Sequence, residues 1–190
     1  MIECEDFYSG TYRSELSFKN KLSRLVWGVV WCMLFRPSPR PLFGWRRLLL
    51  KLFGAKLAST AAVYPSAKIW APWNLQMGER SVLGDCVDCY SVDEIVLEDD
   101  VTVSQYAFLC SASHNIESPS RDLVHQPIRL ERGCWVFAGA FIGMGIVVGE
   151  GAVVAARSVV VKDVESFSVV GGNPSKLIKR RKADWVARGK

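Results

Sequence analysis

The sequence predicts an all-β solenoid, a coil of short stacked strands, preceded by helices. Two observations support this prediction: apolar residues recur every six positions through the middle of the chain, and they recur at helical spacing before it. A period of six matches neither an α-helix, with about 3.6 residues per turn, nor the simple alternation of a strand. The 190 residues suffice for one such domain with a small appendage.

The first region, residues 1–56, is expected to form a helical cap. Apolar residues recur at helical spacing over 22–33, and the proline-rich stretch 37–41 interrupts them. A second short helix is predicted over 45–53. Three basic residues lie opposite its apolar side: Arg46, Arg47 and Lys51.

These helices have two interpretations. They can close the open end of the solenoid, which requires Trp27, Trp31 and Trp45 to be buried. Alternatively, their aromatic and basic character suits a membrane surface. Capping is the favoured interpretation, and weak peripheral membrane contact through residues 16–56 is kept as a second role.

The solenoid itself is assigned to residues 57–170. Its expected core residues, three per turn over five turns, are Val63, Ile69, Leu75, Met77, Leu83, Cys89, Leu97, Val103, Leu109, Leu130, Val136, Ile142, Val148, Val154 and Val160. Small or β-branched residues follow most of them by four positions. Glycine directly after several of them, as at Gly78, Gly84 and Gly149, is attributed to the turn conformation.

Two segments depart from the repeat. Between Leu109 and Leu130 the period is lost, so a loop over 115–127 is expected to leave the coil. Residues 171–190 are expected to form a basic C-terminal tail or short helix. Irregular insertions on a rigid repeat are where function tends to lie.

The composition excludes several classes of protein. With 49% hydrophobic residues the chain is not disordered, and no apolar run approaches the roughly 18 residues of a membrane span. The acidic N-terminus does not fit a signal peptide, so a cytoplasmic protein is expected. The net charge of +5 combines basic segments at 13–56 and 176–190 with an acidic middle, which does not predict the continuous basic face of a nucleic-acid-binding protein.

The six cysteines show no disulfide framework. Cys86 and Cys89 form one C-x-x-C pair, but a tetrahedral zinc site needs two further ligands at suitable spacing. Buried, reduced thiols are therefore the favoured interpretation, and no metal is expected.

The repeat, the segment Ser113-His114-Asn115 and the C-terminal stretch from Gly171 to Lys176 resemble the hexapeptide-repeat acyltransferases. The similarity covers about residues 16–182 and is strongest to galactoside/maltose O-acetyltransferases and colanic-acid-biosynthesis type acetyltransferases. It implies a left-handed parallel β-helix, a homotrimer, and acetyl-CoA as acyl donor.

His114 is the predicted general base. It ends a repeat at the mouth of the long loop, imidazole accepts protons near neutral pH, and the resemblance puts the family's catalytic histidine here. The other histidine, His125, is interpreted as solvent-exposed and incidental. The resemblance also implies an oxyanion donor near Ala138, where a backbone N–H replaces the serine hydroxyl of many relatives.

The resemblance further implies a CoA groove between adjacent subunits. Lys162, Lys176 and Lys179 would supply positive charge for the CoA phosphates. The complete set of positions expected to bind the cofactor is Ala138, Ala156, Val161, Lys162, Lys176 and Lys179.

The acceptor is expected to be a sugar or another glycoconjugate precursor. Asp85 and Asp93 are the predicted substrate-binding residues, from an irregular stretch that also holds Asp88 and Tyr90. O-acetylation of a hydroxyl is the leading function. The alternatives are N-acetylation of an amino sugar nucleotide and a non-catalytic β-helix scaffold.

Overall fold

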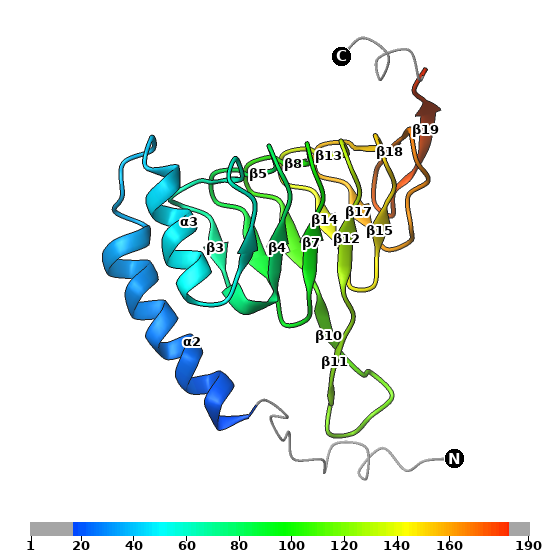
Figure 1. Cartoon of the computed structure of the whole chain (residues 1–190). Coiled ribbons are helices and arrows are strands. Elements are labelled where there is room, and N and C mark those ends of the chain that lie inside the picture. The colour runs from blue at the N-terminus through cyan, green and yellow to red at the C-terminus, as the bar shows by residue number, and fades with distance from the viewer. Residues whose placement is uncertain (1–16, 183–190) are drawn as a thin grey trace.

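The computed structural model describes residues 17–182. Three sheets wrap around one core as a β-solenoid of about six turns, and their strands are parallel except for the last strand of one sheet. Successive strands along the chain join successive sheets, so each turn adds one strand to each sheet. The coil runs from the helices at its N-terminal end to the last strands at the other end (Figure 1).

We name the sheets A, B and C. Sheet A contains β1 (Lys56–Leu57), β4 (Leu75–Met77), β7 (Ile95–Leu97), β12 (Ile128–Leu130) and β15 (Val147–Val148). Sheet B contains β2 (Ala62–Val63), β5 (Val82–Leu83), β8 (Thr102–Val103), β13 (Trp135–Val136), β16 (Val153–Val154), β18 (Ser168–Gly171) and β19 (Lys176–Arg180). Sheet C contains β3 (Lys68–Ile69), β6 (Asp88–Tyr90), β9 (Phe108–Cys110), β14 (Phe141–Ile142) and β17 (Val159–Val160). The chain passes the A–B, B–C and C–A corners in turn.

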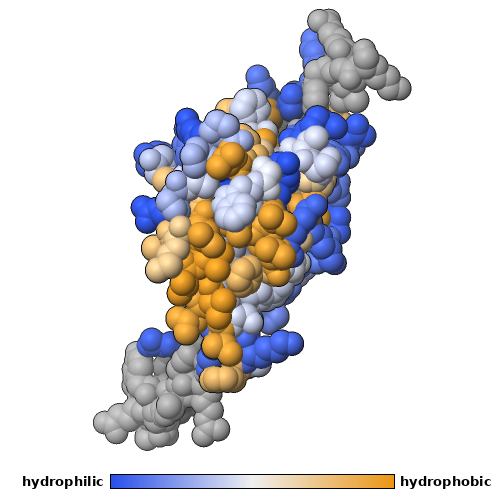
Figure 2. Space-filling view, turned by 60° about the vertical axis from the view of Figure 1, so that its left-hand side comes forward, coloured by the Kyte–Doolittle hydropathy of each residue, from blue (hydrophilic) through white to orange (hydrophobic). Residues whose placement is uncertain are grey.

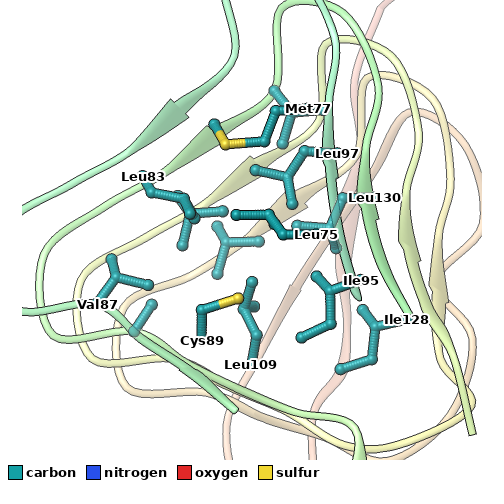
Figure 3. Close-up of a cluster of buried hydrophobic side chains, with 14 of the residues drawn as sticks. Leu75, Met77, Leu83, Val87, Cys89, Ile95, Leu97, Leu109, Ile128 and Leu130 are labelled. Atoms are coloured by element: carbon teal, nitrogen blue, oxygen red, sulfur yellow. The ribbon is translucent and has the colours of Figure 1, made fainter. Parts of the chain in front are cut away.

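The core is the column of inward-facing side chains predicted from the six-residue period. Every one of those residues is buried, and ten side chains of the core are labelled in Figure 3. The expected count of five turns is one short, because Leu57 precedes the predicted set and Val170 follows it. Leu75 is also not an independent position, since it shares β4 with Met77.

The turn geometry corrects the interpretation of the glycines. Left-handed backbone occurs three residues after the core position, at Arg80, Cys86, Asp100, Tyr106, Gly133, Gly139, Gly145, Gly151 and Arg157. Glycine directly after a core position has a different reason, which is the close approach of the next turn. A Cβ at Gly149 would lie 2.5 Å from the backbone nitrogen of Ser166, and one at Gly78 would lie 2.7 Å from that of Asp99.

Helices cover the N-terminal end of the coil. They are α2 (Phe18–Val30), the π-helical turn η1 (Trp31–Phe35) and α3 (Phe43–Leu52), and a short 3₁₀ helix, η2 (Pro72–Asn74), lies within the coil. Leu49 and Leu50 of α3 and Trp27 of α2 pack into the core, so the helices do cap the solenoid. Trp45, however, is 39% exposed rather than buried.

Arg46 was expected on the polar side of α3, and it is instead fully buried. Its guanidinium donates hydrogen bonds to the carbonyl oxygens of Val63, Pro39 and Arg40, at 2.6, 2.9 and 2.6 Å. Burial lowers the pKa of Arg46. These bonds satisfy the buried charge and fix α3 and the preceding proline-rich turn on the first coil.

The C-terminal segment is a strand as far as it is described. Strand β19 pairs antiparallel with β18, where a tail or short helix was expected. The remaining part of that prediction, residues 183–190, lies outside the described residues.

Candidate functional site

The predicted loop over 115–127 contains the turn and the second strand of a β-hairpin at the C–A corner. Strands β10 (Ala112–His114) and β11 (Leu123–His125) pair antiparallel, with His114 opposite Leu123 and Ala112 opposite His125. The hairpin projects away from the coil (Figure 1). The hairpin is an insertion into one turn of the coil, whereas the strands on either side of it in the chain, β9 and β12, belong to the repeat.

His114 is exposed on this hairpin, and its ring is held by its own loop. Its Nδ1 lies 2.7 Å from the carbonyl oxygen of Arg121. A carbonyl can only accept, so in the neutral ring Nδ1 carries the proton and Nε2 keeps the lone pair. This is the tautomer that a general base working through Nε2 requires.

A cavity of about 310 Å³ lies at the base of the hairpin. Its lining is mostly apolar and consists of Cys110, Ala112, Ser113, Phe141, Gly143, Met144 and Val161. It contains the predicted Val161 and the immediate neighbour of His114. The sequence did not single out Phe141 or Met144, because an outward-facing apolar residue beside a core position carries no separate signal.

A second cavity, of about 210 Å³, begins at the residue after Val161. Its lining consists of Lys162, Asp163, Val164, Glu165, Ser168, Val170, Ser175 and Leu177. The Ser168 hydroxyl in this lining is buried and has no hydrogen-bond partner among the described residues. Lys176 and Lys179 are exposed on the adjoining strand β19. The two cavities are thus lined by consecutive residues, Val161 and Lys162, and Leu177 of β19, the strand that carries Lys176 and Lys179, lines the second cavity.

Ala138 and Ala156 line neither of these two cavities. Both are in turns at the B–C corner, after β13 and β16, whereas Val161 and Lys162 follow β17 at the C–A corner. The width of sheet C separates the two groups. Within one chain the structure therefore does not bring these alanines together with His114.

Asp93 lies at the C–A corner, beside the hairpin base, with both carboxylate oxygens engaged. Oδ2 is 2.7 Å from Nδ1 of His125, and Oδ1 accepts the backbone N–H of Glu94 at 2.7 Å. The Asp93 N–H donates to the hydroxyl of the buried Ser111 at 2.9 Å. His125 is about half exposed, as expected, but it is not incidental, because it ties the hairpin to the solenoid.

Asp85 lies elsewhere, at the B–C corner. Its carboxylate accepts a hydrogen bond from Ser66 at 2.7 Å and forms an ion pair with Arg40. These two contacts lower the pKa of the Asp85 carboxyl. It lines a separate cavity of about 480 Å³ on sheet B, so the two predicted acidic residues do not share one site in a single chain.

The cysteine pair is divided between the core and the surface. Cys89 is buried, and burial raises the pKa of its thiol to about 12, whereas Cys86 is exposed in a turn. The expectation that both are buried is therefore wrong for Cys86.

Among residues 17–182, no three His, Cys, Asp or Glu side chains are grouped so that they could hold a metal ion. Over the same residues, no helix has the length and apolar character to cross a membrane.

We compared the chain with protein-family models, with curated proteins and with solved structures. No protein-family model matches the chain. The putative colanic acid biosynthesis acetyltransferase WcaF of Escherichia coli K12 is 36% identical over 162 residues, which cover 85% of this chain and 89% of that protein.

Solved structures agree in fold. A hexapeptide-repeat acetyltransferase from Vibrio cholerae, VCA0836, complexed with acetyl-CoA, matches with a TM-score of 0.78 at 24% identity and covers 96% of this chain and all of that chain. A maltose O-acetyltransferase from Clostridium difficile 630 matches with a TM-score of 0.79 at 23% identity, covering 96% of this chain and 98% of that one. The predicted fold class, a left-handed parallel β-helix with N-terminal helices, is confirmed. On its similarity to WcaF, the chain belongs to the hexapeptide-repeat acetyltransferases, in the colanic-acid-biosynthesis type.

Proposed function

We propose that the protein transfers an acetyl group from acetyl-CoA to a hydroxyl of a sugar or polysaccharide precursor, with His114 as general base. The observation that carries the proposal is the contact of His114 Nδ1 with the Arg121 carbonyl, which gives the neutral ring a basic Nε2 on the hairpin whose neighbouring residue, Ser113, lines the cavity. Acetyl-CoA as donor fits a reaction in the cytoplasm, and no metal is required.

The reaction is a direct displacement. Nε2 of His114 takes the proton of the acceptor hydroxyl while its oxygen attacks the thioester carbonyl carbon. The carbon–sulfur bond then breaks, and the CoA thiolate leaves and recovers the proton from the imidazolium. A thioester is already activated, so no covalent acyl-enzyme is needed. The backbone N–H of Ala138 is the proposed donor to the oxyanion.

The two cavities support one orientation of bound acetyl-CoA, with its thioester end toward the hairpin and its phosphates toward β19. The apolar cavity at the hairpin base suits the pantetheine arm, and its lining residue Ser113 directly precedes His114. Lys162 at the second cavity, with Lys176 and Lys179 on β19, offers positive charge for the CoA phosphates. The unpaired hydroxyl of Ser168 adds a hydrogen-bonding group there.

The position of Ala138 and Ala156 supports a homotrimer with CoA between subunits. These residues and His114 lie at opposite edges of sheet C, so they can line one groove only if two copies contribute different corners. A monomer would lack the proposed oxyanion donor. The reaction thus requires an acetyl-CoA donor, a sugar acceptor and a second copy of the chain.

Asp93 is the better placed of the two proposed acceptor-binding residues. It stands beside the hairpin that carries His114, whereas Asp85 would reach an acceptor there only from another copy. We also propose peripheral membrane contact through residues 16–56, because their helices leave apolar side chains exposed.

The experiment that tests the function measures thiol release from acetyl-CoA with a panel of sugars and nucleotide sugars, and identifies the products by mass spectrometry. The expected result is acceptor-dependent release that yields an acetyl ester. If the product is instead an alkali-stable amide on an amino sugar, the activity is N-acetylation and not O-acetylation. Acceptor-independent background alone across the panel would favour the scaffold.

A further inference from the structure

The N-terminal helices have apolar side chains on two faces, and the fold covers only one of them. A helix that is apolar all round is normally buried all round. Here the inner face packs on the first coil through Trp27, Phe35, Leu49 and Leu50. The opposite face has no cover among the described residues.

This uncovered surface, which we call the outer face, is large and continuous. From α2 to η1 its residues follow one helical stripe, and α3 extends it. Its members are Phe18, Leu22, Leu25, Val26, Val29, Met33, Leu34, Leu42, Trp45, Leu48 and Leu52. Figure 2, turned to bring this end of the molecule forward, shows an extended apolar surface on it. Isolated exposed apolar residues are ordinary, but contiguous patches of this kind mark an interaction surface.

The outer face is held in place from behind. The indole N–H of Trp27 donates to the Ile69 carbonyl at 2.7 Å, and that of Trp31 donates to the Ala67 carbonyl at 2.9 Å. The indole N–H of Trp45 donates to the Leu34 carbonyl at 3.0 Å and joins α3 to η1. Together with the buried Arg46, these bonds prevent the helices from simply turning their apolar side inward.

The positive charge around the outer face favours an anionic lipid surface as its partner. Residues 17–56 contain nine lysines and arginines and no aspartate or glutamate. Lys19, Lys21 and Lys51 are exposed on α2 and α3, and the exposed Arg36 directly follows η1. A second copy docked face to face would bring these like charges together, which disfavours self-association through this surface. An anionic lipid surface offers both an apolar layer and opposite charge.

We propose that the outer face binds the surface of an anionic lipid bilayer, with α2 and α3 lying in the interface. None of the described helices can cross a bilayer, so the contact is peripheral. An anionic bilayer is thus the partner in the membrane contact proposed above, and this binding does not depend on the acetyl transfer. The N-terminal end of the coil would then face the lipid, and the C-terminal strands would point away from it (Figure 1).

The test is co-sedimentation of the full chain with vesicles of phosphatidylcholine containing 30 mol% phosphatidylglycerol, compared with pure phosphatidylcholine. Three outer-face residues are replaced together, Leu25→Glu, Met33→Glu and Leu52→Glu, all at strongly exposed positions where no core packing is lost. The matched control is Ile178→Glu, another exposed apolar residue, on β19 at the far end of the coil. Circular dichroism and light scattering report folding and oligomeric state.

We expect weak binding that is at least about tenfold stronger to the anionic vesicles and falls several-fold at high salt. The triple variant should lose it about tenfold or more, and Ile178→Glu should keep it within twofold. Absence of sedimentation at low salt, or equal binding by the triple variant, would overturn the proposal. A change of mass in the triple variant without a change in lipid binding would instead assign the face to another copy. Transfer to a soluble sugar, measured in parallel, should be the same for the triple variant, so loss of lipid binding leaves the proposed function standing.

Discussion

The B–C and C–A corners of the solenoid join the same kind of strands but are built differently. At the B–C corner the turns repeat with little change, and left-handed backbone recurs at equivalent positions such as Cys86, Tyr106, Gly139 and Arg157. At the C–A corner each turn differs, from the short helix η2 to the hairpin of β10 and β11. His114 belongs to the irregular corner.

The difference follows from what each corner must satisfy. A regular corner has to stack on the turns above and below it, so its backbone is constrained by its neighbours. An insertion at an edge leaves the stacked strands in place, and its side chains are free to serve other purposes. We therefore expect substitutions at the irregular corner to change activity, and substitutions at the stacked turns to change stability.

His114→Ala should give the largest effect. Loss of a general base should lower turnover by roughly 10²–10⁴-fold while leaving acetyl-CoA affinity nearly unchanged. Steady-state kinetics and acetyl-CoA binding by calorimetry measure the two quantities. A folded variant with turnover like that of the unsubstituted protein would remove His114 from the mechanism.

Gly149→Ala tests the stacked A–B turn, where a Cβ would lie 2.5 Å from the Ser166 nitrogen. Overpacking of this kind costs roughly 1–3 kcal/mol, so Tm should fall by several degrees while kcat is retained. Gly28→Ala is the control, because nothing lies within 4 Å of the added Cβ on α2. That control should be neutral or slightly stabilising. Equal losses of stability in both variants would contradict the explanation by close approach.

Lys176→Ala combined with Lys179→Ala should raise the KM for acetyl-CoA by about tenfold, the effect of about 1.4 kcal/mol of lost binding. The increase should shrink for a donor without the 3′-phosphate, if the lysines contact that group. Kinetics with both donors measure this. An equal increase with the two donors would show that the lysines do not recognise the 3′-phosphate.

Asp93→Asn should have a smaller effect, a few-fold loss of kcat/KM for the sugar. The substitution removes the charge that holds His125 and loosens the base of the hairpin. Hydrogen exchange of the 112–125 amides should become faster. Asp85→Asn, at the B–C corner, is the matched control and should leave this exchange unchanged. The opposite pattern, with only Asp85→Asn raising the KM for the sugar, would move the acceptor to the B–C corner of a neighbouring copy.

The repeat was predictable from the amino-acid sequence, because each turn buries the same few positions and the six-residue period is therefore visible among neighbouring residues. The loss of the period after Leu109 also indicated the insertion that carries His114, whose role as general base stays a prediction. The turn glycines were found but misinterpreted, since Gly149 is required by Ser166, a residue of the next turn. A glycine required by close contact with the next turn and a glycine required by left-handed backbone look the same in the sequence. Local sequence pattern therefore does not distinguish the two.

The amino-acid sequence did not predict which distant residues meet in the fold or which surfaces remain uncovered. Asp93 and His125 are 32 positions apart and come together through the path of the coil around one corner. The helices before the coil carry apolar residues on both sides, and their spacing does not say which side is buried. That choice depends on where Trp27, Trp31 and Arg46 find hydrogen-bond acceptors on the first coil, a property of the assembled fold rather than of the helical sequence.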